Sequence, residues 1–146
     1  MSRFKVLLAS IGLVLGLAAC SAAVQLDFSA DLTTDAEVPA PDLDGATPSG
    51  SATATLNEAE DTLTISGDFS GLTGPATGAH IHGPAEEGET EGVVFPLNVD
   101  AAASGELSGT WDDITEDEVQ QLRDGLFYVN VHTDLNAAGE IRGQLK

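Results

Sequence analysis

Apolar and polar residues alternate in several short segments of this chain, and this period of two restricts its fold more than any other feature. In residues 26–32, for example, Leu26, Phe28, Ala30 and Leu32 alternate with polar side chains. Successive side chains of a β-strand point to opposite faces, so this pattern predicts a strand with one buried face. The same alternation predicts strands at 52–56 and 62–69, and we expect further strands at 79–82, 93–99, 107–111, 127–133 and 140–145.

The predicted strands are short, and residues that favour turns separate them. Such a series is typical of all-β proteins, so we expect a Greek-key-like β-sandwich or barrel of about eight strands. Apolar residues make up 42% of the chain, which is enough to fill one core. Pro96 lies inside the strand at 93–99, and because proline lacks an N–H, that strand should lie at an edge or contain a bulge.

One short helix interrupts the strands. Thr115 and Glu118 have the spacing of a capping box, in which each side chain bonds the other residue's backbone N–H. Gly125 is suited to end the helix, because glycine readily adopts the left-handed conformation found there. We expect a helix of two to three turns that connects two strands.

The first 19 residues predict an export signal. Arg3 and Lys5 precede an uncharged apolar stretch over residues 6–19. A membrane span needs roughly 20 apolar residues, and because this stretch gives out near Val24, its length is borderline for a span. The positive start followed by an apolar stretch favours a signal peptide.

The segment Leu17–Cys20 resembles the bacterial lipobox, in which two small residues precede a cysteine. The resemblance implies that the Cys20 thiol is acylated and that the signal is cut just before it. We therefore expect a signal peptide at 1–19, a lipid-anchored tether at 20–25 and a domain at 26–146. Because Ser21 follows the cysteine, the resemblance implies an exported lipoprotein of the outer membrane or cell surface.

The predicted domain is strongly acidic. Without residues 1–19, 3 basic residues remain against 24 acidic ones, which gives a net charge of −21. A nucleic-acid partner is excluded on this basis, because neutralising phosphates needs clustered Lys and Arg. The surface is better suited to an extracellular protein, a polysaccharide or cations.

All three histidines fall in two of the predicted strands. His80 and His82 share one face of their strand, and His132 shares a face with Asn130 on another. If these strands are neighbours, three imidazoles converge and can hold one copper or zinc ion. Glu140 is then a candidate fourth ligand or supporting partner, together with Asn130 and Arg142.

The same residues also fit a buried polar network without a metal, in which the histidines donate to carboxylates and Asn130 and Arg142 complete the hydrogen bonds. The spacing leaves both interpretations open. An enzyme is not expected, because no serine has the surroundings of a nucleophile and the single cysteine is the predicted anchor.

Five segments, taken in order, resemble the CHRD domain, which is named after the animal protein chordin and also occurs in exported bacterial proteins. They are Glu37–Pro39, Gly78–Ala85, Leu122–Gly125, Tyr128–Thr133 and Gly139–Leu145. The resemblance extends over about residues 26–145 and implies a β-sandwich or barrel, with all three histidines inside its motifs. Chordin's role in sequestering bone morphogenetic proteins does not carry over, because that partner is absent from bacteria.

Two functions are therefore expected. The first is a non-enzymatic binding or structural module, anchored through Cys20 and displayed at the cell surface. The second is a mononuclear copper or zinc protein that uses His80, His82 and His132, with redox chemistry as an option if the metal is copper.

Overall fold

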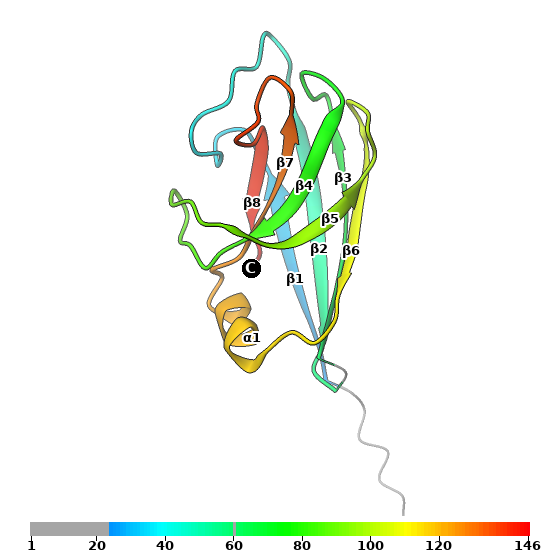
Figure 1. Cartoon of the computed structure of the whole chain (residues 1–146), viewed down its shortest axis with the longest axis vertical. Helices are drawn as coiled ribbons and strands as arrows, with labels where there is room; N and C mark the ends of the chain where they lie inside the picture. The colour runs from blue at the N-terminus through cyan, green and yellow to red at the C-terminus, as the bar shows by residue number, and fades with distance from the viewer. Residues whose placement is uncertain (1–23, 60) are drawn as a thin grey trace, which may run out of the picture.

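The computed structural model describes residues 24–59 and 61–146, which form eight antiparallel strands and one helix (Figure 1). The predicted signal peptide and Cys20 lie outside the described residues. The strands are β1 (Gln25–Leu32), β2 (Ser49–Asn57), β3 (Thr62–Ser70), β4 (Ala76–His82), β5 (Val93–Val99), β6 (Gly105–Trp111), β7 (Tyr128–Thr133) and β8 (Ile141–Gln144). The helix α1 spans Glu116–Arg123.

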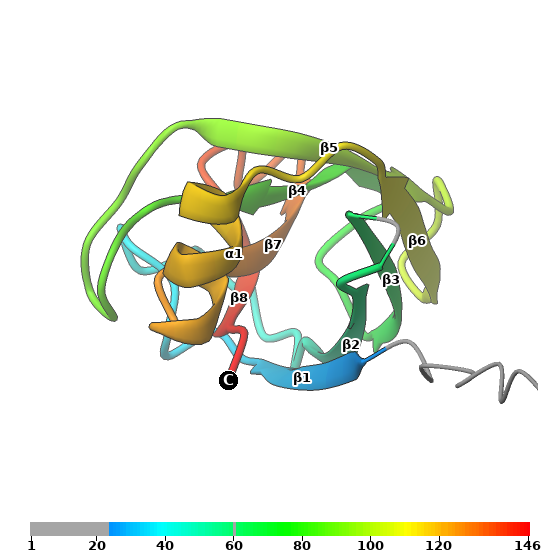
Figure 2. The same cartoon turned by 90° about the horizontal axis from the view of Figure 1, so that it is seen from below.

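The strands follow the order β1-β2-β3-β6-β5-β4-β7-β8 around the molecule. β3 therefore pairs with β6 rather than with β4, and β4 pairs with β7. These two crossovers give the Greek-key arrangement that the sequence predicts. Figure 2 shows the strands surrounding a common interior.

The barrel is nearly closed. β5 pairs with β6 only at Asn98 and Val99, so this junction is short. On the other side, Ser29 and Lys146 exchange two backbone hydrogen bonds of 2.9 and 3.0 Å, and Thr33 exchanges two more with Arg142. These contacts join β1 to β8 and settle the choice between sandwich and barrel in favour of a barrel with two thin junctions.

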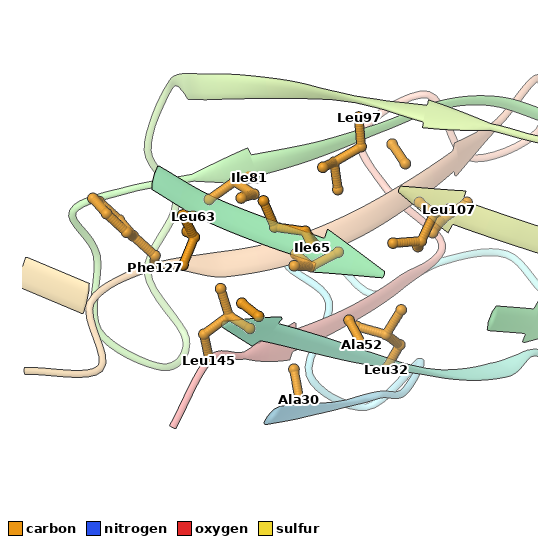
Figure 3. Packing of buried hydrophobic residues seen from close by; sticks show 14 of the residues in the cluster. Ala30, Leu32, Ala52, Leu63, Ile65, Ile81, Leu97, Leu107, Phe127 and Leu145 are labelled. Atoms are coloured by element: carbon orange, nitrogen blue, oxygen red, sulfur yellow. The ribbon is translucent and has the colours of Figure 1, made fainter. Parts of the chain in front are cut away.

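Every strand contributes apolar side chains to one core inside the barrel. In Figure 3, Ile65 from β3, Ile81 from β4 and Leu107 from β6 point into the same interior. Burial of each such side chain stabilises the fold by roughly 1.5–3 kcal/mol. Because Ile81 faces this core, the alternation of β4 directs its two histidines to the outer side of the barrel.

The helix forms as its capping box predicts. The Thr115 hydroxyl accepts from the Glu118 N–H, and the Glu118 carboxylate accepts from the Thr115 N–H at 2.8 Å. Leu122 is the buried residue of the helix and enters the core, while Gly125 follows with φ +70°. The helix thus lies between β6 and β7 in the chain and packs at the lower end of the barrel (Figure 1).

The strand that contains Pro96 is not an edge strand, because β5 lies between β4 and β6. The alternative, a bulge, is confirmed: the β4–β5 register shifts between Ile81 and His82. Pro96 also lies before Asn98, the first β5 residue that pairs with β6. The missing N–H of Pro96 therefore interrupts no hydrogen bond between β5 and β6.

Candidate metal centre

The three histidines lie on two neighbouring strands, as the metal hypothesis requires. β4 and β7 run antiparallel in a register that pairs His80 with Asn130 and His82 with Tyr128. His132 pairs with Gly78, whose missing side chain leaves space for the rings: a Cβ there would lie 3.2 Å from Cε1 of His80. The strand pattern and this glycine together bring the imidazoles into one group.

The distances within this His cluster (His80, His82 and His132) are short. Nδ1 of His80 lies 3.0 Å from Nε2 of His132, and the two ring centroids are 4.9 Å apart. One nitrogen from each ring lies within 4.8 Å of the others. Within residues 24–59 and 61–146, this is the one group of three or more potential ligands that is close enough to hold a metal.

Backbone carbonyls determine which ring nitrogens carry protons. Nδ1–H of His82 donates to the Glu91 carbonyl at 2.8 Å, and Nδ1–H of His132 donates to the Ala137 carbonyl at 3.1 Å. In the neutral rings, Nε2 of both histidines therefore keeps its lone pair. Metal-binding histidines are typically oriented in this way by a second partner on the other ring nitrogen.

One of these lone pairs has no partner. His82 is only 9% exposed, and its buried Nε2 forms no hydrogen bond to any described residue. Leaving a buried polar atom unsatisfied costs about 1–3 kcal/mol. A ligand bound at Nε2 would remove this cost.

The electrostatics favour neutral imidazoles. Burial, followed by the neighbouring His80, lowers the pKa of His132 to about 4. Burial, and then the charge on His82, also lowers the pKa of His80. At neutral pH both rings are unprotonated at one nitrogen, which is the form that binds a metal.

The geometry matches one small transition-metal ion. With metal–nitrogen bonds of about 2.0–2.1 Å, two ligands of a tetrahedral ion lie about 3.3 Å apart. The 3.0 Å separation of His80 and His132 is close to this value, and His82 has a ring nitrogen within 4.8 Å of both, so the three can bind one ion once the rings draw together. Three protein ligands leave one coordination position open, as in many sites where a metal exchanges or reacts.

Glu140 lies outside the group. Its carboxylate accepts hydrogen bonds from the Thr73 N–H at 2.7 Å, the Asn136 amide at 2.8 Å and the Thr133 hydroxyl at 2.6 Å. Although burial raises the pKa of Glu140, these hydrogen bonds outweigh it and lower the pKa overall. The carboxylate thus links the loops that contain Thr73 and Asn136 to Thr133 of β7, and the structure does not place it as a fourth ligand.

Asn130 and Arg142 lie near the cluster and make no hydrogen bond to it. The Asn130 amide donates to the Ala138 carbonyl at 3.5 Å, and its Oδ1 has no partner among the described residues. Buried Glu37 lies beside it, with Oε2 likewise unpaired in the described chain. Arg142 stacks on Tyr128, with Cζ 3.5 Å from the ring centroid.

Sequence reasoning missed three parts of the site. The carbonyls of Glu91 and Ala137 fix the ring protons, but a carbonyl is common to all residues and leaves no mark in a sequence. Tyr128 stacks on His82, with ring centroids 5.0 Å apart and an interplanar angle of 7°. The alternation of its strand places Tyr128 on the face of His132, but it gives no sign that the Tyr128 ring stacks on His82.

No helix among the described residues is long and apolar enough to cross a membrane.

Comparison with known proteins assigns the chain to a family. No curated protein and no solved structure matches it. A family model described as the CHRD domain matches residues 28–145, which cover the barrel from β1 to the residue after β8. The three histidines, Asn130 and Arg142 all lie inside this match. The chain therefore belongs to the CHRD domain family.

Proposed function

We propose that this chain is a non-enzymatic module that binds one copper or zinc ion through His80, His82 and His132. The observation that carries the proposal is the buried, unpaired Nε2 of His82 beside two further imidazoles. Three neutral nitrogen ligands suit copper and zinc, whereas calcium and magnesium prefer oxygen.

The acidic surface supports this function. The described residues include far more carboxylates than basic groups, so the domain attracts cations over a range of several ångströms. Exposed carboxylates bind cations weakly, and the buried imidazoles supply the selective site. The surface therefore raises the local concentration of the ion that the His cluster binds.

A titration tests the proposal. The full chain is purified in detergent, freed of metal by a chelator and titrated separately with Zn(II), Cu(II) and Cu(I). We expect it to bind one equivalent, and comparison of the three titrations identifies the preferred ion. His82→Ala should lose this binding, since it removes one of three ligands. Calcium should not compete.

A matched acidic variant controls for binding at the surface. Asp68 and Glu106 face each other on the outside of β3 and β6, and both are exposed. The double variant Asp68→Asn, Glu106→Gln should bind as the wild type does. Equal binding by wild type and His82→Ala would refute the site.

We also propose that the module is exported and anchored to the membrane through Cys20. The lipobox at Leu17–Cys20 and the preceding apolar stretch support this. Cys20→Ala should abolish incorporation of labelled palmitate and move the protein to the soluble fraction. A variant that still requires detergent for extraction would overturn the anchor and leave the metal proposal untouched.

A further inference from the structure

Arg142 is a buried cation with an unusual set of partners. It is 1% exposed, and neither of the two ion pairs found among the described residues includes it. Its guanidinium instead donates to the carbonyls of Glu89 at 2.7 Å and Glu86 at 3.3 Å. Backbone carbonyls, rather than a carboxylate in direct contact, satisfy this buried guanidinium, although its charge also acts on buried Glu37. The carbonyl contacts point to a specific task for Arg142.

Arg142 is linked to the His cluster in two ways, and the first link is its stacking on Tyr128. The Arg142 guanidinium lies 3.5 Å from the centre of the Tyr128 ring, and that ring is stacked on His82. Because β7 lies between β4 and β8, Tyr128 is held between the two other side chains. Stacking of this kind restricts the plane of the His82 imidazole.

The second link to His82 runs through the backbone of the segment 86–91. The Glu91 carbonyl accepts from Nδ1–H of His82, and it lies in the segment 86–91 that Arg142 holds. The Tyr128 hydroxyl lies 3.3 Å from both the N and the O of Glu91. The ring plane and the tautomer of His82 therefore both depend on contacts that Arg142 supports.

We propose that Arg142 is a positioning residue for the metal ligand His82, acting through Tyr128 and the segment 86–91. It keeps the His82 proton on Nδ1, so that the buried Nε2 remains a lone-pair donor. This inference rests on the proposed function, because positioning of a ligand matters only where a ligand binds.

The test compares full-length variants in metal-free and zinc-titrated protein. Arg142→Met removes the guanidinium, and we expect roughly 10–100-fold weaker Zn(II) binding, the usual effect of losing a supporting partner. In ¹⁵N-histidine NMR spectra of the metal-free protein, His82 should change from a single Nδ1–H tautomer to a mixture. A loss of packing alone would not move this tautomer signal.

Two further variants keep the test decisive. Arg123→Met also removes a cation, but one that pairs with Glu58 outside the site, and it should match wild type in both measurements. If Arg142→Met does not fold, Tyr128→Phe takes its place, since it retains the ring and loses both contacts to Glu91. It should show the same tautomer mixture with a smaller loss of affinity.

The outcomes separate the two proposals. Unchanged zinc affinity and a single His82 tautomer in Arg142→Met, or in Tyr128→Phe where Arg142→Met does not fold, would overturn the positioning role. If wild type binds no metal, the proposed function fails, and the tautomer spectra alone then decide whether Arg142 controls His82.

Discussion

Nδ1 of His80 and Nε2 of His132 lie 3.0 Å apart, although 52 positions separate these residues in the chain. Nδ1 of His132 already donates to the Ala137 carbonyl. The proton between the two rings therefore belongs to His80 in the neutral protein. A metal that binds both of these nitrogens must take the place of this proton.

The first prediction concerns that proton. In metal-free protein near pH 7, we expect a His80 Nδ1–H resonance that exchanges slowly with solvent, because the bond is partly buried. One equivalent of Zn(II) should remove it, as measured by ¹H–¹⁵N NMR. Persistence of the resonance in the zinc-saturated protein would show that His80 Nδ1 is not a ligand.

The second prediction concerns Gly78. A Cβ at this position would lie 3.2 Å from Cε1 and 3.6 Å from Nε2 of His80, so Gly78→Ala should displace that ring. We expect about 10-fold weaker zinc binding, of the order seen when ligand orientation is disturbed. Gly74→Ala is the matched control, since a Cβ there meets nothing within 4 Å. Equal affinities in the two variants would contradict the role assigned to Gly78.

The third prediction concerns Glu37. Burial raises its pKa, and the Val38 N–H is the leading contact that opposes this shift. A raised folded-state pKa means that ionisation destabilises the fold, so wild type loses stability as the pH rises from the ordinary glutamate value through the folded one. Glu37→Gln still accepts from the Val38 N–H and has no charge to bury.

Glu37→Gln should therefore unfold at a higher temperature than wild type at pH 8, and the gain should disappear below about pH 4.5, where the unfolded carboxyl is also protonated. Thermal unfolding across this pH range measures the difference. A variant that is less stable than wild type at pH 8 would show that the carboxylate is needed in its ionised form.

The fourth prediction concerns acid. The pKa of His132 is about 4 in the fold and 6.5 in its ordinary state, so between these values the unfolded chain takes up a proton that the fold excludes. Stability from this group is intact above pH 6.5 and is lost as the pH falls to about 4. The loss is smaller than the full difference in pKa would give, because solvent screens the partly exposed ring.

Urea unfolding of metal-free protein at several pH values measures this dependence. His132→Asn carries no titrating group there, so its stability should fall less steeply than that of wild type between pH 6.5 and 4. Parallel slopes for the two proteins would rule out His132 as the source of the acid sensitivity.

Much of the fold follows from local patterns. The period of two in residues 26–32 and 127–133 predicts strands that the structure confirms as β1 and β7, and the spacing of Thr115 and Glu118 predicts the start of α1. These features depend on neighbouring residues only. Strand pairing depends on distant residues. For this reason the sequence allowed Pro96 to lie in an edge strand, whereas β5 lies between β4 and β6.

The same limit applies to the candidate site. Alternation places His80, His82 and His132 on polar faces, and it predicts that they can meet only if β4 and β7 are neighbours. It could not separate Glu140 from the cluster, because hydrogen bonds from Thr73 and Asn136 come from loops whose paths no local pattern determines. Long-range topology was the missing information.

The β1–β8 junction has a consequence for self-association. The backbone bonds from Ser29 to Lys146 and from Thr33 to Arg142 give both terminal strands a partner on each side within the described chain. An open sheet edge is a template for strand exchange between molecules. Copies of the domain that approach one another therefore meet paired backbone along β1 and β8, and the repulsion between their net negative charges also opposes fibre growth.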